Sequence, residues 1–110
     1  MKYMVLIYDD ERTWEELGDG ERAEHLSRYR ALGSRPGVLA GEGLKPTSTA
    51  TTLRVRNGDL ALTDGPFAET KEQLGGFYLI DAPTLDDALA FARDVPAAEY
   101  GAVEVRPVGP

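Results

Sequence analysis

The sequence of 110 residues contains no cysteine and a single histidine, His25. Without cysteine the chain can form no disulfide framework, no thiolate nucleophile and no cysteine-ligated metal site. A lone histidine also disfavours a transition-metal or haem site, which leaves only the binding of hard cations by carboxylates open. We therefore expect a protein without a metal ion or another cofactor.

Basic residues are scarce, with 12 lysines and arginines against 19 acidic residues and a net charge of −7. Nucleic acids and anionic membranes both require a basic surface, so neither is an expected partner. Much of the acid is concentrated in residues 9–24, where only Arg12 and Arg22 are basic. This acidic segment is either a solvated face or a surface that repels wrong partners.

Long hydrophobic runs are also missing. The apolar start of the chain, MKYMVLIYD, is too short to cross a bilayer or to serve as the core of a signal peptide. The expectation is a soluble, cytoplasmic protein. A length of 110 residues suits one domain that covers residues 1–110.

The pattern of the remaining residues predicts an α+β fold. A first strand at 2–8 precedes a short helical turn at 13–17, begun by a capping box of Thr13 and Glu16, and a helix at 20–32 capped by Asp19. Strands are then expected at 38–44, 52–56, 59–63, 77–81 and 102–108, with a second helix that begins after Thr84 through a capping box with Asp87. This order matches the ferredoxin-like split βαβ plan with an inserted β-hairpin.

The hairpin is signalled by Asn57-Gly58, because this pair between alternating runs favours a two-residue turn. The turn predicts that Val55 pairs with Leu60 and Leu53 with Leu62. It also places Arg56 opposite Asp59, so opposite charges meet beside the turn.

The first strand is apolar on both faces, whereas two helices cover only one face of such a sheet. The other face needs a cover. A second copy of the chain, packed sheet to sheet, would make a homodimer. Alternatively, the loop at 64–76 folds over the open face.

His25 is the natural candidate for a general acid/base, because histidine titrates near neutral pH. Its position on the predicted helix, four residues before Tyr29, is equally typical of a half-buried histidine without a task. Four polar residues could meet at one end of the sheet, or could be ordinary strand-edge polarity: Tyr8 and Asp9 at the end of the first strand, Glu42 on the second and Arg106 on the last.

The loop at 64–76 carries more polar residues than a turn requires. Asp64, Gly65 and Pro66 suit a tight turn, and Phe67 is expected to anchor the loop by being buried under it. Gly75-Gly76 either forms a bulge at the next strand or leaves space for a ligand. The charged run with Glu69, Lys71 and Glu72 is then a solvated surface or a binding surface.

The run DGPFAETKEQLGGFYLIDA closely resembles the signature of the YCII-related proteins, in particular their DGPF branch. The segments MKYMVLIY, GEGLKPTSTATTLRVR and YGAVEVRPV agree, so the resemblance covers the whole chain. It implies a dimeric α+β barrel and, since members are often encoded beside sigma factors, a regulatory setting. The helix RAEHLSRY is similar to one with a proposed active-site histidine, which assigns that role to His25, with Asp64 or Asp94 as its aspartate partner.

Two functions follow as hypotheses. In the first, a cofactor-independent enzyme acts on a small organic molecule, with His25 and Asp64 as catalytic residues. The residues that would bind the substrate are Tyr8, Glu42, Phe67, Glu69, Lys71 and Arg106. In the second, a non-catalytic dimer senses a ligand or binds a regulatory protein through the acidic segment or the loop at 64–76. A covalent hydrolase or transferase is set aside, because the chain has no cysteine and no serine in a nucleophile motif.

Overall fold

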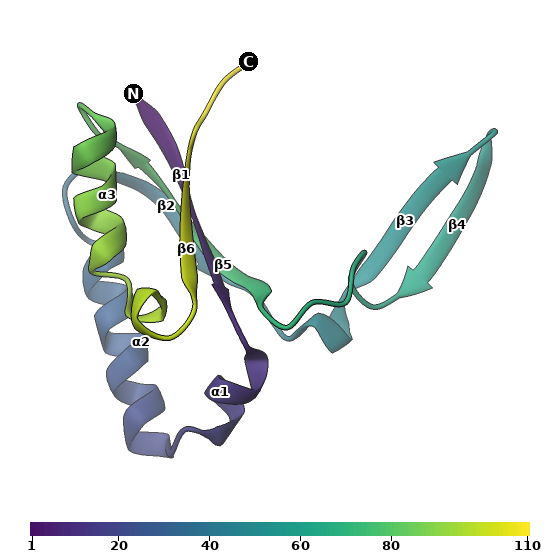
Figure 1. Cartoon of the computed structure of the whole chain (residues 1–110), viewed down its shortest axis with the longest axis horizontal. Coiled ribbons are helices and arrows are strands. Elements are labelled where there is room, and N and C mark those ends of the chain that lie inside the picture. Colours follow the sequence, from purple (N-terminus) through teal and green to yellow (C-terminus); the bar gives the residue numbers. More distant parts are fainter.

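The computed structural model describes all residues from Met1 to Pro110. A four-stranded antiparallel sheet has the order β2-β5-β1-β6, and its strands are β1 (Lys2–Asp9), β2 (Val38–Gly43), β5 (Gln73–Asp81) and β6 (Ala102–Pro107). The helices α2 (Asp19–Gly33) and α3 (Leu85–Arg93) lie on one side of this sheet (Figure 1). This is the plan of a ferredoxin-like α+β fold, as the sequence predicted.

Short elements complete the body. The helix α1 (Glu11–Glu16) follows β1 directly, and 3₁₀ turns occupy Thr47–Thr49 and Pro96–Glu99. The N-cap of α1 is Asp10, whose carboxylate accepts a hydrogen bond from the Arg12 amide at 3.0 Å. The prediction of a turn begun by Thr13 was therefore wrong, because the helix starts two residues earlier on a stronger cap. Similarly, Gly18 rather than Asp19 is the N-cap of α2.

The N-cap of the second predicted capping box is confirmed. Thr84 caps α3, where its hydroxyl accepts from the Asp87 amide at 3.2 Å and donates to the Asp87 carboxylate at 2.8 Å. The carboxylate therefore binds the hydroxyl of Thr84 and not its amide, so the reciprocal half of the capping box is not formed.

The core lies between the sheet and the two helices. It is formed by alternate residues of the strands, chiefly Tyr3, Val5, Ile7, Tyr78 and Ile80, against Leu32, Ala88 and Ala92 from the helices. Only 13 of the 110 residues are buried, so this core is small. The opposite face of the sheet, with Met4, Leu6, Phe77 and Leu79, has no layer packed on it.

The strands β3 (Thr51–Arg56) and β4 (Asp59–Asp64) form a separate two-stranded sheet that stands away from the body as an arm (Figure 1). Asn57 and Gly58 both have positive φ, at 54° and 81°, as the predicted turn requires. All three predicted pairs, Val55–Leu60, Leu53–Leu62 and Arg56–Asp59, are confirmed.

The arm makes the molecule more extended than its length requires. The radius of gyration is 15.7 Å, against about 13 Å for a compact domain of 100 residues. Leu53, Val55, Leu60 and Leu62 on the arm are between 55% and 63% exposed. Phe67 is 80% exposed, so the expectation that it is buried under its loop was wrong. The loop turns outward toward the arm and leaves this ring without a core to enter.

Candidate functional site

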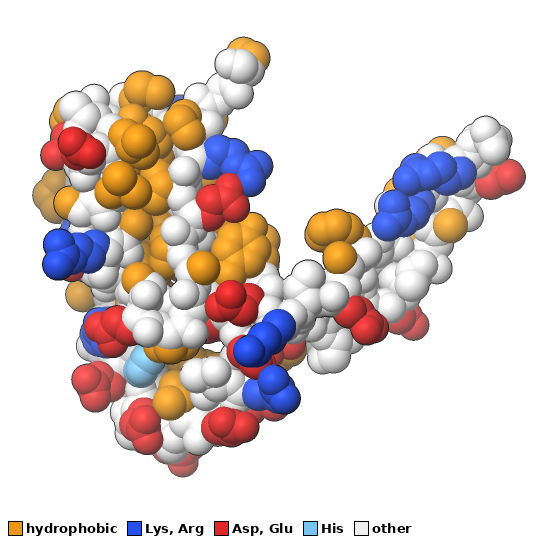
Figure 2. Space-filling view, in the orientation of Figure 1, with side chains coloured by type: hydrophobic (Ala, Val, Ile, Leu, Met, Phe, Trp, Pro, Cys, Tyr) orange, Lys and Arg blue, Asp and Glu red, His pale blue; other side chains and the backbone are white.

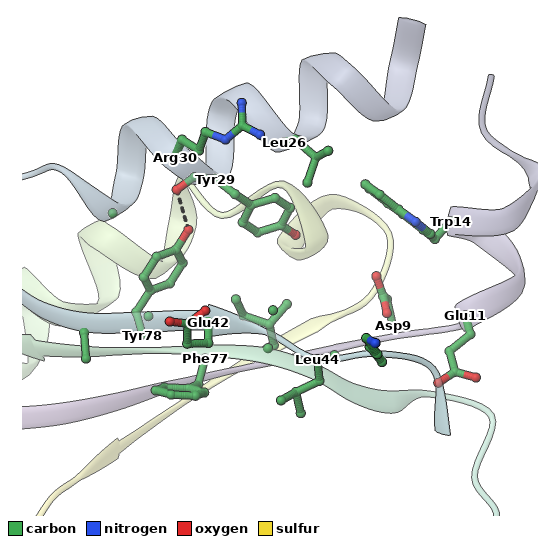
Figure 3. A pocket seen from close by; sticks show the side chains of 18 of the residues that line it. Asp9, Glu11, Trp14, Leu26, Tyr29, Arg30, Glu42, Leu44, Phe77 and Tyr78 are labelled. Atoms are coloured by element: carbon green, nitrogen blue, oxygen red, sulfur yellow. Dashed lines mark hydrogen bonds between the residues drawn. The ribbon is translucent and has the colours of Figure 1, made fainter. Parts of the chain in front are cut away.

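A cavity of about 660 Å³ lies between α2, α1 and the edge of the sheet formed by β2 and β5 (Figure 3). Its volume falls within the ~300–1,000 Å³ usual for small-molecule sites. Roughly half of its lining residues are hydrophobic, among them Leu26, Val38, Leu39 and Leu44. The space is therefore suited to a molecule with an apolar body.

The wall between α2 and the sheet is fixed by Tyr78. Its ring rises from β5 toward α2, and its hydroxyl donates a hydrogen bond of 2.6 Å to the carbonyl oxygen of Tyr29 (Figure 3). Burial raises the pKa of Tyr78, so its hydroxyl stays a donor at neutral pH. The side chain of Tyr29 then points from α2 down into the cavity.

The helix α1 supplies Trp14, the only tryptophan of the chain. Arg22 on α2 holds α1 in place, because its guanidinium donates to the carbonyl oxygens of Trp14 at 3.0 Å and Glu15 at 2.6 Å. The Trp14 carbonyl oxygen also accepts from the Leu17 amide at 3.3 Å, so Arg22 adds to the bonding at the C-terminal end of α1. The Trp14 ring consequently faces the cavity from the side opposite β1 (Figure 3).

Asp9, at the end of β1, directs its carboxyl group toward Tyr29 and Trp14 (Figure 3). Gly101 passes so close to this point that an added Cβ would lie 2.2 Å from the Tyr8 carbonyl oxygen and 3.1 Å from Asp9 Cβ. Partial burial raises the pKa of Asp9, and the nearby carboxylates of Glu11, Asp10 and Glu72 raise it further. The site thus holds a carboxyl group that ionises less readily than usual.

His25 is half-buried and lies beside the cavity rather than in its lining. Its Nδ1 is 3.4 Å from the hydroxyl of Tyr100, which does line the cavity. The ring also packs edge-on against Trp14, with 6.3 Å between centroids. His25 therefore reaches the cavity through Tyr100, and the direction of that hydrogen bond depends on the tautomer of His25.

The two tyrosines are difficult to ionise. Burial raises the pKa of Tyr29 well above its usual range, and the neighbouring Tyr100 adds to this effect. Burial also raises the pKa of Tyr100, with a further contribution from the charge of Asp9. Both phenols are accordingly hydrogen-bond donors and acceptors in this site, rather than bases.

The structure separates the residues that the sequence suggested for one site. Glu42 lines the cavity, whereas Tyr8 and Arg106 lie on the uncovered side of the sheet, where Arg106 pairs with Glu104. Asp94 binds Arg35 at 2.8 Å near the C-terminal ends of α2 and α3. Neither Asp64 nor Asp94 makes a contact with His25, whose polar neighbour is Tyr100.

The loop at 64–76 forms a second, polar hollow. It is lined by Thr47, Ser48, Asp64, Gly65, Pro66, Glu69, Thr70 and Gln73. Lys71 is near enough to Asp10 to help lower its pKa, which the hydrogen bonds from Arg12 hold at about 2. The strand pairing shifts at Gly75-Gly76, as the bulge alternative predicted, and both glycines also line the main cavity.

Three aromatic residues of the cavity were not singled out as site residues from the sequence, namely Trp14, Tyr29 and Tyr100. A signal existed only for Trp14, because a lone tryptophan within an acidic segment is unusual for a solvated face. Tyr29 and Tyr100 belong to the site only through tertiary packing. No group of three or more histidine or acidic side chains is placed to hold a metal ion.

Fold and cavity together define a small α+β protein with a ligand-sized site beside its sheet. The chain matches the YCII-related domain over residues 1–110, and it belongs to this family. It is 46% identical over 114 residues to an uncharacterised protein of Rhizobium meliloti (strain 1021), a match that covers 98% of this chain and 92% of that relative. It is also 31% identical over 88 residues to a threonine synthase of Synechocystis sp. (strain ATCC 27184 / PCC 6803 / Kazusa), covering 80% of this chain but 22% of that protein. No helix is long and apolar enough to cross a membrane.

Proposed function

We propose that the protein is a cofactor-independent enzyme that binds a small organic molecule in the cavity and transfers protons to or from it. The observation that carries the proposal is the 3.4 Å contact between His25 Nδ1 and the Tyr100 hydroxyl. Through it, the only histidine of the chain can exchange a proton with a group that lines the cavity.

In this mechanism Tyr100 faces the bound molecule and His25 supplies or removes the proton behind it. The contact is long for a hydrogen bond, and catalytic contacts often shorten when a ligand binds. Asp9 serves as a second proton acceptor or donor on the same molecule, and Glu42 binds a polar group of it. A role for Tyr8, Asp64, Phe67, Glu69, Lys71 or Arg106 in ligand binding stays a prediction, since these residues lie outside the cavity.

The test uses NMR in D₂O with a panel of small ketones, lactones, phenols and amines. We expect at least one compound that binds the cavity to exchange a proton for deuterium, or to be converted, faster than without protein. His25→Gln and Tyr100→Phe should each lower this rate by about 10²-fold or more, the usual contribution of general acid/base catalysis. Binding should change little in His25→Gln, because His25 does not line the cavity.

Equal rates for the wild type and both variants would contradict the catalytic proposal. A compound that binds without reacting would then favour the alternative of a non-catalytic module that senses a ligand in a sigma-factor type of transcription regulation. That alternative further requires a protein partner, for which the exposed residues Glu69, Lys71 and Glu72 are the proposed contact.

We also propose that the protein is a homodimer, a dimeric α+β barrel of the DGPF branch, assembled over the uncovered face of the sheet. Two observations support a second copy as the cover. The face with Met4, Leu6, Phe77 and Leu79 has no layer packed on it, and the arm exposes four apolar side chains. A hairpin of two strands is marginally stable in water by itself, so the arm requires a surface to pack on.

A further inference from the structure

The three carboxyl groups where β1 meets α1 differ in what holds them. Both oxygens of Glu11 accept hydrogen bonds from Thr47, one from its amide at 2.7 Å and one from its hydroxyl at 3.0 Å. Asp10 is bound by the guanidinium of Arg12 at 2.8 Å. Asp9 has neither arrangement, because no group of the protein donates a hydrogen bond to its carboxyl group. Burial and like charges are the only influences on its pKa. A carboxyl group that is partly removed from water without a partner is costly unless a ligand supplies one.

Aromatic rings surround this unpartnered group. Trp14 from α1 and Tyr29 from α2 converge on Asp9 from above, and Tyr100 lies close enough to sense its charge (Figure 3). The faces of tryptophan and tyrosine rings attract cations, and tryptophan does so most strongly. Aromatic rings next to an unpaired carboxylate form the environment in which proteins hold organic ammonium groups.

The charges around the cavity also favour a cationic ligand. Glu11, Asp10 and Glu72 are the charged residues that act on Asp9, and all are acidic. Arg12 and Lys71, the nearby basic residues, act on Asp10 instead. Two basic residues, Arg30 and Lys45, line the cavity. The Arg30 side chain runs along α2 rather than toward Asp9, and Lys45 is not among the charges that act on Asp9 (Figure 3). Acidic side chains also gather over α1 and the start of α2 at the surface, which attracts cations toward this end (Figure 2).

We infer that the ligand of this cavity is an organic amine in its protonated form, with the ammonium group bound to Asp9 between Trp14 and Tyr29. Its apolar body lies along Leu26, Val38 and Leu39. A cavity of about 660 Å³ accommodates an aromatic or branched aliphatic amine with room for further groups. The inference rests on the proposed function because both place the ligand in the same cavity. It adds the chemical class of that ligand.

The test compares three probes with one apolar body and different head groups, namely benzylamine, benzyl alcohol and benzoate, by isothermal titration calorimetry and by amide NMR shifts at pH 7. Benzylamine should bind about tenfold or more tightly than benzyl alcohol, and benzoate least, because the head group meets Asp9. Asp9→Asn should reduce benzylamine to the affinity of benzyl alcohol. The control Asp86→Asn makes the same charge change on α3, far from the cavity lining, and should keep the wild-type order.

The possible results distinguish a failure of the amine inference from a failure of the proposed function. Benzoate binding as tightly as benzylamine, or an amine preference that survives in Asp9→Asn, would overturn the ammonium inference while leaving the cavity as a ligand site. If none of the three probes binds, or if the NMR shifts lie outside the cavity, the inference fails together with the proposed function. Turnover of a neutral or anionic compound in the D₂O experiment would leave the enzyme proposal standing and contradict only the amine class.

Discussion

Asp9 is the residue on which most of the site depends. Its carboxyl group lies at the end of a strand whose alternate residues Tyr3, Val5 and Ile7 are buried. It is beside Gly101, where no larger residue fits without a shift of the backbone. The raised pKa of Asp9 means that the folded protein holds this proton more tightly than the unfolded chain does. A residue of this kind costs stability when ionised, and such costs are concentrated at functional sites.

The first prediction concerns this cost. Above pH 3.8, the usual pKa of an aspartate, the stability that Asp9 contributes is lost as pH rises through its raised pKa, because ionisation is less favourable in the folded state. Asp9→Asn should therefore unfold at a higher temperature than the wild type at pH 7, and the difference should vanish below pH 3.8. Thermal unfolding followed by circular dichroism from pH 3 to pH 8 measures this difference.

Asp10 provides a control, because its ionised carboxylate has the opposite effect on the stability of the fold. Its pKa is lowered to about 2 by Arg12, so its ionised form stabilises the fold above pH 3.8 and this contribution is lost as pH falls toward 2. Asp10→Asn should lower the unfolding temperature at pH 7. If Asp9→Asn also unfolds at a lower temperature than the wild type at pH 7, as Asp10→Asn should, the role given to Asp9 is contradicted.

At the scale of the elements, local rules explain what the sequence predicted well. The pairing of β3 and β4 follows from Asn57-Gly58 alone, because the turn fixes which residues face each other. The start of α3 follows from Thr84 and Asp87 in the same way. The first helix was misplaced because Asp10 and Thr13 are both acceptable caps, and only the end of β1 decides between them.

The site could be predicted only in part, for a physical reason. Asp9, Trp14, Tyr29 and Tyr100 come from four different elements, and tertiary packing alone brings them together. His25 was found because it is the single histidine, but its link to the cavity runs through Tyr100, 75 residues away in the sequence. Phe67 shows the converse error, since an aromatic residue after a turn was taken as an anchor although the loop leads to an arm without a core.

At the scale of the whole molecule, the small core and the exposed arm are the features from which we propose a dimer. With 13 of 110 residues buried, a single copy leaves both the sheet face and the arm uncovered. In a dimer with twofold symmetry each arm can pack on the partner. The same contact then occurs twice and covers the arm and the sheet face of both copies. Trp14, Leu26 and Tyr29 line the cavity from the helix side of the sheet, whereas Phe77, which also lines it, belongs to the uncovered face.

The dimer is tested by two substitutions in one strand. Leu62 and Ala61 point to opposite faces of β4, because neighbouring strand residues alternate. Leu62→Asp should raise the dimer dissociation constant about tenfold or more, whereas Ala61→Asp, with the same added charge, should change it little. Sedimentation equilibrium gives both constants. A wild-type protein that sediments as a monomer at all concentrations, or equal effects of the two variants, would contradict the proposal.

A crystal structure of the protein grown with benzylamine would show whether this cavity holds a small organic ligand at Asp9. We expect ordered density for the amine in the cavity, with its nitrogen at hydrogen-bond distance from the Asp9 carboxylate and its ring between Tyr29 and Trp14. A cavity filled by side chains of the protein or of a second copy, or an amine bound only elsewhere, would contradict it.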